Sequence, residues 1–219
     1  MGLGDYAESF GIDRTLRAGR VTIAKRHRLR VSSFFAGPNG AGKSSHAGPI
    51  LESLRISTFV NADLIARGLV GYDTSLAAFS AGRIMLKRLD ELASERKDFA
   101  FESTLSSKTF AKFISCCKRV GYLVSIYYFS LRSSDDAVRR VRHWVAMGGH
   151  SIPEVDIRRR FTRSAVNFFD LYVLLADEFT VFDNTSDHEA LIIATFNGHS
   201  LTVLDFERWT HLKLLAARS

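Results

Sequence analysis

The stretch RVSSFFAGPNGAGKSS, residues 30–45, decides the fold of this chain. An apolar, β-prone run leads directly into a glycine-rich turn that fits the pattern G-x-x-x-x-G-K-[ST] from Gly37 to Ser44. The segment that leaves the turn, 44–55, is compatible with a helix. The glycines let successive backbone N–H groups turn inward, and the helix adds the positive end of its dipole. Strand, loop and helix in this order predict a phosphate-binding loop (P-loop).

The P-loop predicts a nucleotide site with defined contacts. Lys43 is expected to reach the β- and γ-phosphates of ATP, and the hydroxyl of Ser44 to contact Mg²⁺. The alternative, an ordinary glycine-rich turn with a solvated lysine, is disfavoured by the strand before the turn and the helix after it. The motif specifies no reaction, because many enzymes and transporters share it. The predicted nucleotide-binding residues of the loop are Gly37, Pro38, Asn39, Gly40, Ala41, Gly42, Lys43, Ser44 and Ser45.

The remaining sequence alternates short apolar segments with longer helical ones. Its 219 residues are enough for one substantial core, and 46% of them are hydrophobic. Strands are predicted at 57–61, 99–103, 123–130 and 179–183, and helices at 77–95, 107–120 and 135–147, with a further helix opening at Pro153. This alternation predicts an α/β fold, a P-loop NTPase with a mostly parallel sheet flanked by helices. Residues 1–29 are predicted to be a basic N-terminal appendage, and residues 30–219 a P-loop kinase-like domain.

Polar side chains follow two of the predicted strands. Asn61 and Asp63 come at the end of the strand at 57–61, and Glu102 near the end of the strand at 99–103. The carboxyl ends of parallel strands meet at one edge of a sheet, where such sheets bind ligands. These side chains are therefore expected beside the P-loop.

The residue types at this edge suit a kinase. Asp63 is the expected general base, because transfer to an alcohol needs a carboxylate that accepts the hydroxyl proton and orients the oxygen. The alternative is that Asp63 caps a helix beginning near Leu64. Glu102 is expected to hold a water on Mg²⁺ or the acceptor. The predicted acceptor-binding residues are Asn61, Asp63, Glu102 and Thr104, and the predicted metal-binding residues are Ser44 and Glu102.

Eight arginines lie between Arg132 and Arg163, around the pair Gly148-Gly149. The planar guanidinium matches phosphate oxygens, and phosphoryl transfer needs positive charge around the transferred group. The sequence therefore predicts an arginine-rich lid at about 135–165, with the glycines as its hinge and His150 as a lesser candidate for substrate contact. The alternative is that some of these arginines bind RNA or pair with neighbouring acids, which are Asp135, Asp136, Glu154 and Asp156.

Net charge and composition limit the classes of partner and the compartment that we expect for this chain. The net charge of +7 favours a phosphate-bearing partner, either nucleic acid or a smaller polyphosphate ligand. The cysteines, Cys116 and Cys117, are adjacent, which suits neither a zinc site nor a disulfide framework and favours a reducing compartment. No run approaches the ~18 apolar residues that span a bilayer, and the first residues lack the features of a secretory signal. A cytoplasmic protein without a membrane segment is expected.

Five motifs, taken in order, resemble those of the zeta-toxin family of P-loop kinases, and more closely its short stand-alone branch often described as ATPases. They are AGPNGAGKSS, FVNADLIA, FESTLSS, RRVRHWVAMGGHSIPEVDIRRRFTRS and VFDNTS, between about Val31 and Asn184. The resemblance implies ATP and Mg²⁺ as cofactors, Asp63 as the base and Glu102 beside the metal and acceptor. It also implies that Asp183 and Asn184 lie near the adenine. The catalytic set it implies is Lys43, Asp63, Glu102 and lid arginines among Arg140, Arg158, Arg159 and Arg163.

The resemblance implies an enzyme that transfers the γ-phosphoryl group of ATP to a hydroxyl of a small molecule, such as a UDP-sugar, and an antitoxin or inhibitor protein as a partner. Trp144 departs from the family pattern, because related lids carry an arginine there. The phosphate contact of that arginine is therefore either absent here or supplied by Arg142. The regions that the best-known toxins use around a UDP-sugar are not evident.

Two other functions stay open at the level of the sequence. A nucleic-acid kinase or a nucleotide-dependent RNA-binding factor would also explain the basic charge, including the run at 25–30. A non-enzymatic partner-binding protein is the third option. The complete set of Lys43, Ser44, Asp63 and Glu102 disfavours this last option.

Overall fold

The structure is a computed structural model that describes residues 30–69, 74–149, 151–186 and 189–217. The predicted appendage at 1–29 and His150 lie outside the described residues. The strands are β1 (Arg30–Ala36), β2 (Phe59–Val60), β3 (Phe99–Ser103), β4 (Tyr122–Ser130), β5 (Glu178–Asp183), β6 (Leu191–Phe196) and β7 (Leu201–Val203). The helices are α2 (Lys43–Leu54), α3 (Ala62–Gly68), α4 (Thr74–Ser94), α5 (Thr109–Arg119), α6 (Ser134–Ala146), α7 (Glu154–Asn167), the π-helix η1 (Phe168–Tyr172), α8 (Val173–Leu175) and α9 (Phe206–Ala217).

The strands form one sheet in the order β2-β3-β1-β4-β5-β6-β7. Pairing is parallel from β2 across to β5, whereas β5 with β6 and β6 with β7 pair antiparallel. The prediction of an α/β P-loop NTPase with a mostly parallel sheet is confirmed, and the predicted elements agree with the observed ones to within three residues at each end. The antiparallel extension β6–β7 and the helix α9 were not predicted.

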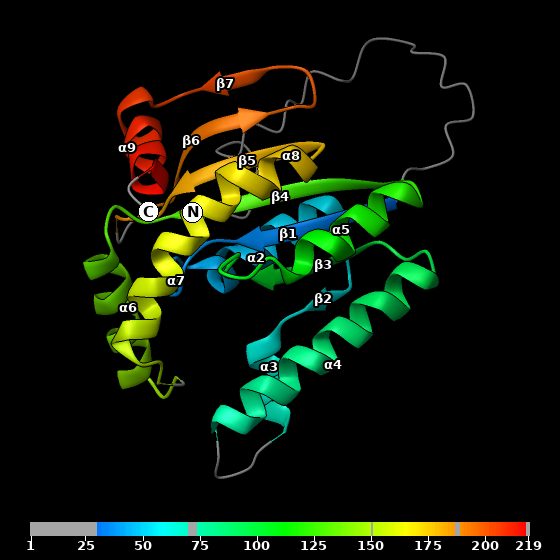
Figure 1. Cartoon of the computed structure of the whole chain (residues 1–219), viewed down its shortest axis with the longest axis horizontal. Coiled ribbons are helices and arrows are strands. Elements are labelled where there is room, and N and C mark those ends of the chain that lie inside the picture. The colour runs from blue at the N-terminus through cyan, green and yellow to red at the C-terminus, as the bar shows by residue number, and fades with distance from the viewer. Residues whose placement is uncertain (1–29, 70–73, 150, 187–188, 218–219) are drawn as a thin grey trace.

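Helices cover both faces of the sheet, with α5 in front of it and α2 behind it in Figure 1. Successive residues of β1 point to opposite faces, so Phe34 packs into the core under α4, α5 and α9, and Phe35 into the core under α2 and α6. The ring of Phe34 meets Phe101 of β3 edge-on, with 4.2 Å between the ring centroids. No helix within the described ranges is both long and apolar enough to cross a bilayer.

The carboxyl ends of the central strands lie together at one edge of the sheet, because β3, β1 and β4 run parallel. The helices α6 and α7 stand beside this edge, and α3 leaves β2 at its lower end (Figure 1). The turn between β1 and α2 opens at the same edge. The fold thus brings the P-loop, the ends of β2 and β3 and the predicted lid to one side of the molecule.

Substitution of Phe34 tests whether the core on this face of the sheet stabilises the fold. We expect Phe34→Ala to lower the free energy of unfolding by about 3–5 kcal/mol, because the ring is fully buried against Phe101 and its removal leaves a cavity. Phe79→Ala is the control, since that side chain is 70% exposed. It should change the free energy of unfolding by no more than about 0.5 kcal/mol. Denaturant titration measures both, and equal losses would contradict the layered core.

Candidate functional site

The P-loop has the backbone conformation that its glycines predict. Gly37 and Gly42 have φ values of 135° and 79°, a region that other residues rarely adopt. A Cβ atom on Gly37 would lie 2.1 Å from the carbonyl oxygen of Phe129, and one on Gly42 would lie 2.3 Å from Nδ2 of Asn184. These two glycines let the loop approach β4 and Asn184 closely, which fixes where α2 begins.

Lys43 lies at the mouth of this loop with a side chain that is almost completely buried. Its Nζ donates a hydrogen bond to the carbonyl oxygen of Pro38 at 2.9 Å and lies 3.6 Å from Oε1 of Glu102. A buried ammonium needs such partners, because desolvation without them is costly. The loop therefore holds a cation against its own backbone, in the place where the sequence predicts phosphate contacts.

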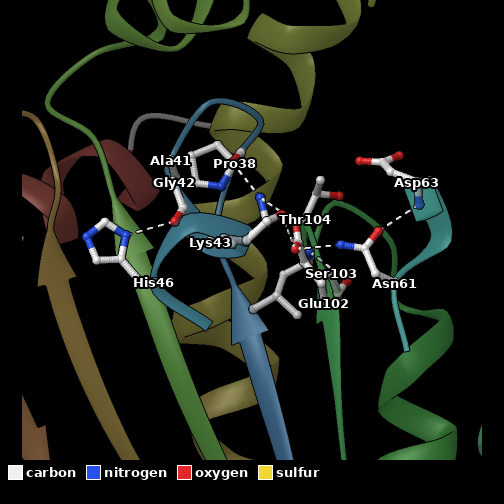
Figure 2. A network of polar contacts seen from close by, with 12 residues as sticks. Pro38, Ala41, Gly42, Lys43, His46, Asn61, Asp63, Glu102, Ser103 and Thr104 are labelled. Carbon is white, nitrogen blue, oxygen red and sulfur yellow. Dashed lines mark hydrogen bonds and ion pairs between the residues drawn. The ribbon is translucent and has the colours of Figure 1, made fainter. Parts of the chain in front are cut away.

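Glu102 is the centre of the polar network in Figure 2. Its Oε2 accepts hydrogen bonds from Oγ of Ser44 at 2.6 Å and from Nδ2 of Asn61 at 2.8 Å, while Oε1 faces Lys43. The carboxylate thus joins the first turn of α2 to the end of β2. A hydroxyl and a carboxylate in direct contact are the hard oxygen donors that Mg²⁺ prefers, so the predicted pair of Ser44 and Glu102 fits that ion.

Asn61, and not Asp63, caps α3. The side-chain oxygen of Asn61 accepts hydrogen bonds from the backbone N–H groups of Asp63 at 2.8 Å and Leu64 at 3.3 Å. The alternative that Asp63 is the helix cap is therefore wrong. The exposed carboxylate of Asp63 points toward the space between α3 and the P-loop in Figure 2. Asn61 thus binds Glu102 with one end of its amide and positions the helix that carries Asp63 with the other.

Thr104 directly follows the last residue of β3 and lies beside Lys43 in Figure 2. Its hydroxyl exchanges a hydrogen bond of 2.8 Å with Ser106. Neither residue caps a helix, because α5 begins at Thr109 and the hydroxyl of Ser107 accepts the Thr109 N–H. The Thr104 side chain therefore lies at the site and does not cap α5.

Asn184, which follows Ala41 by 143 positions in the sequence, contacts the P-loop. Its buried amide Nδ2 donates to the carbonyl oxygen of Ala41 at 2.9 Å, and its backbone N–H donates to Ser130 at the end of β4. The neighbouring Asp183 is instead paired with Arg208 of α9, 3.1 Å from its Nε. The structure thus brings Asn184, but not the Asp183 carboxylate, into contact with the predicted nucleotide loop.

Two of the predicted lid arginines are held by neighbouring acids. Arg158 lies 2.8 Å from Glu154 and 2.6 Å from Asp135, and Arg159 lies 2.6 Å from Asp156. Hydrogen bonds with Glu154 and Asp135 raise the pKa of Arg158 above its usual value, and those with Arg158 lower the pKa of Glu154. These pairs connect α6 to α7 and stabilise the turns of α7. They place neither arginine in contact with the P-loop.

The other lid arginines have different surroundings. Arg140 donates from Nη2 to the carbonyl oxygen of Ser186 at 2.8 Å, close to the chain after β5. Arg142 pairs with Glu154 at 2.7 Å. Arg142 would have to leave Glu154 to supply the contact expected of the arginine that Trp144 replaces. The Trp144 ring instead lies against Gly149 and under the guanidinium of Arg67 from α3, with 5.8 Å to the ring centroid.

Arg160 and Arg163 lie one turn apart on α7, and neither forms an ion pair with any residue that the structure describes. The catalytic set expected from the sequence includes Arg163 but not Arg160. Acids three or four residues before Arg158 and Arg159 predict the helical ion pairs of those two arginines. Glu154 and Asp156 stand nine and seven residues before Arg163, outside that range, whereas Asp156 stands four residues before Arg160 and pairs with Arg159 instead.

Comparison with known proteins identifies the fold. No family model matches the chain, and no curated protein matches it. A chain of the AvrRxo1-ORF1:-ORF2 complex has a TM-score of 0.66 at 14% identity, and the same complex with ATP one of 0.65 at 14%. Both matches cover 84% of this chain, which spans only 63% of the chain it matches. A chain of the PezAT toxin-antitoxin system of Streptococcus pneumoniae has a TM-score of 0.57 at 12% identity, covering 89% of this chain and 87% of that one.

The contact between Asn184 and Ala41 predicts a role in nucleotide affinity. We expect Asn184→Ala to raise the dissociation constant for ATP about tenfold, because the Ala41 carbonyl loses its donor and the loop its support. Asn184→Asp should weaken ATP binding further, since a carboxylate oxygen then faces that carbonyl. Isothermal titration calorimetry measures both constants. Wild-type affinity in both variants would show that Asn184 does not position the loop.

Proposed function

We propose that this chain is an ATP-dependent kinase that transfers the γ-phosphoryl group to a hydroxyl of a small molecule. The observation that carries the proposal is the set of contacts at Glu102, whose carboxylate binds Ser44 at the P-loop and Asn61 at the cap of the Asp63 helix. The Glu102 carboxylate thus connects the predicted nucleotide-binding loop to the predicted acceptor-binding residues.

The arrangement supports an in-line displacement. The carboxylate of Asp63 accepts the proton of the acceptor hydroxyl while the hydroxyl oxygen forms a bond to the γ-phosphorus. The bond from that phosphorus to the oxygen of the β-phosphate breaks, and ADP leaves. Lys43 exchanges the Pro38 carbonyl for phosphate oxygens and stabilises the negative charge that develops on them.

Ser44 and Glu102 are the residues that would hold Mg²⁺. When bound, the ion neutralises charge on the β- and γ-phosphates. Asn61 then keeps one oxygen of Glu102 in place, because its amide is fixed at the other end by the backbone of α3. The acceptor-binding set is Asn61, Asp63, Glu102 and Thr104.

In the proposed reaction, arginines of the lid supply positive charge around the transferred phosphoryl group. Among the four candidate arginines, Arg163 is the one that forms no ion pair with the residues that the structure describes, and Arg140 would have to leave the carbonyl oxygen of Ser186 to approach phosphate oxygens. Arg158 and Arg159 would first have to leave Glu154, Asp135 and Asp156. We therefore propose that Arg158 and Arg159 take part in catalysis only after the lid rearranges and these ion pairs break.

The resemblance to zeta toxins supports a UDP-sugar as acceptor. The same resemblance and the likeness to a chain of the PezAT toxin-antitoxin system support an antitoxin as partner. The AvrRxo1-ORF1:-ORF2 complex also contains a second chain, and a structure of it was solved with ATP. A nucleic-acid kinase remains the second candidate, because a chain of the Pnkp1/Rnl/Hen1 RNA repair complex has a TM-score of 0.53 at 18% identity, over 64% of this chain and 45% of that one.

Asp63→Asn tests the base. We expect ATP affinity to stay within about twofold of wild type and transfer to fall by about 10²–10⁴-fold, because the amide cannot accept the proton. The cap of α3 stays intact, since Asn61 provides it. Asp90→Asn, another exposed acid on the neighbouring α4, is the matched control and should leave both values unchanged. Undiminished transfer by Asp63→Asn would remove Asp63 from this role.

The acceptor is found by incubating the protein with γ-labelled ATP and a metabolite extract, and in parallel with RNA oligonucleotides. A labelled small molecule, identified by mass spectrometry and absent with Asp63→Asn, is the expected product. Labelled RNA alone would replace the proposal with a nucleic-acid kinase. Absence of any labelled product in both mixtures would contradict kinase activity.

A further inference from the structure

One contact connects α3, the helix that carries Asp63, to the lid. The guanidinium of Arg67, near the end of α3, lies over the ring of Trp144 on α6, with 5.8 Å from its Cζ atom to the ring centroid. Helix α3 follows β2 and α6 follows β4, so the two residues come from different parts of the fold (Figure 1). A guanidinium within about 6 Å of a ring centroid is attracted by the negative face of the ring.

The ring of Trp144 is held by the turn that ends α6. The backbone N–H of Gly149 donates to the carbonyl oxygen of Trp144 at 3.0 Å, and that of Gly148 donates to the carbonyl oxygen of Val145 at 2.9 Å. This turn brings residue 149 onto the indole, where a Cβ atom on Gly149 would lie only 2.3 Å from Cδ2 of the ring. The glycine therefore lets the backbone pack directly on the half-buried ring and fixes where the ring lies.

Arg67 also stands at a spacing from Asp63 that favours an ion pair. The two residues are four positions apart on α3 and share one face of the helix. On α7 the same spacing gives an ion pair, with 2.8 Å between Glu154 and Arg158. On α3 no such pair forms, and within the described ranges Arg67 makes no ion pair and no side-chain hydrogen bond. The ring of Trp144 therefore binds the cation that the helical spacing would otherwise give to Asp63.

The strengths of the two contacts explain this outcome. An exposed ion pair across one helical turn is a weak interaction, because water screens both charges and both side chains have to be ordered. Trp offers the strongest aromatic face for a cation, and the ring of Trp144 is already held by Gly149, so only Arg67 has to be ordered. The contact of Arg67 with Trp144 is therefore favoured over pairing with Asp63.

The carboxylate of Asp63 is left without an ion pair in the part of the chain that the structure describes. The charged groups across from it in Figure 2 are Lys43 and Glu102, which face each other at 3.6 Å. The charged residues of α4 line a hollow with Leu64 and Ile65, and they are Lys87, Arg88 and Glu91. A carboxylate that is paired with an arginine accepts a proton less readily. A base at Asp63 therefore works best when Arg67 is held elsewhere.

We propose that Trp144 is a positioning residue for phosphoryl transfer, because its ring holds Arg67 away from the carboxylate of Asp63. This inference rests on the proposed function for the role of Asp63 as the base. Trp144 acts on Asp63 only through Arg67. Removal of the ring is therefore harmful only while the arginine is present.

Variants of the full chain test this dependence through the rate of transfer from γ-labelled ATP to the metabolite extract. W144L should lower the rate about tenfold, because Arg67 then pairs with Asp63. W144F keeps an aromatic face and should stay within about twofold of wild type, as should R67Q. The double variant W144L/R67Q should also return to within about twofold of wild type, since no cation is left to pair with Asp63. The dissociation constant for ATP, measured by calorimetry, should be unchanged in all four.

Gly149→Ala is an independent test that leaves both partners in place. The added Cβ atom would overlap the indole, so the ring of Trp144 has to move away from its position. The rate of transfer should fall as in W144L, and R67Q should restore it. Gly82→Ala on α4 is the matched control, because a Cβ atom there meets no other atom within 4 Å. Thermal denaturation checks that every variant is folded.

A crystal structure of W144L should show a guanidinium nitrogen of Arg67 within about 4 Å of a carboxylate oxygen of Asp63. The proposal is overturned if Arg67 stays away from Asp63 in that structure. It is also overturned if W144L and R67Q lose equal rates and the double variant is not restored, because the pair would then be a brace between α3 and α6. If the wild type labels no acceptor, the kinase proposal fails, while the W144L structure still decides whether Trp144 keeps Arg67 from Asp63.

Discussion

The carboxylate of Glu102 is the interaction on which the site depends. It meets Lys43, Ser44 and Asn61, which come from two elements separated from it by about 40 to 60 residues of chain. The strand order explains how this is possible, because β3 lies between β1, which leads into the P-loop, and β2, which leads into α3. Removing this carboxylate would leave Lys43 buried against a single carbonyl oxygen. Breaking a buried pair in this way is strongly destabilising, so the network serves both stability and chemistry.

The parts of the site that the sequence could predict are those that depend on local pattern. The P-loop spacing, the acids after 57–61 and 99–103 and the strand–helix alternation all follow from short-range rules, and the parallel sheet then brings the strand ends together. The contact of Asn184 with Ala41 spans 143 positions, so no local rule gives its geometry. The family resemblance placed Asn184 at the nucleotide, and the structure shows contact with the loop that would hold it.

The sequence also contains local patterns that are typical of the hairpin between β6 and β7 and of the ion pairs on α7. The Asn197-Gly198 pair between two β-branched runs is typical of a tight hairpin, and it is where β6 turns into β7. The i to i+3 and i to i+4 spacing of Asp156 with Arg159 and of Glu154 with Arg158 predicts their ion pairs. Two features had no such signal. The π-helical η1 and the left-handed conformation of Leu105 arise from tertiary packing.

The ion pairs of α6 and α7 change what the positive net charge of the chain implies about its binding partners. Four lid arginines, at 139, 142, 158 and 159, are neutralised locally by acids of the same two helices. A surface on which arginines and acids alternate in this way presents little net field to a nucleic-acid backbone, whose binding depends on many unpaired cations. Among the residues that the structure describes, Lys108 and Arg163 have no acidic partner, and both line one hollow beside α7. A few cations around one hollow discriminate between small anions by geometry, which suits a kinase that must recognise one metabolite.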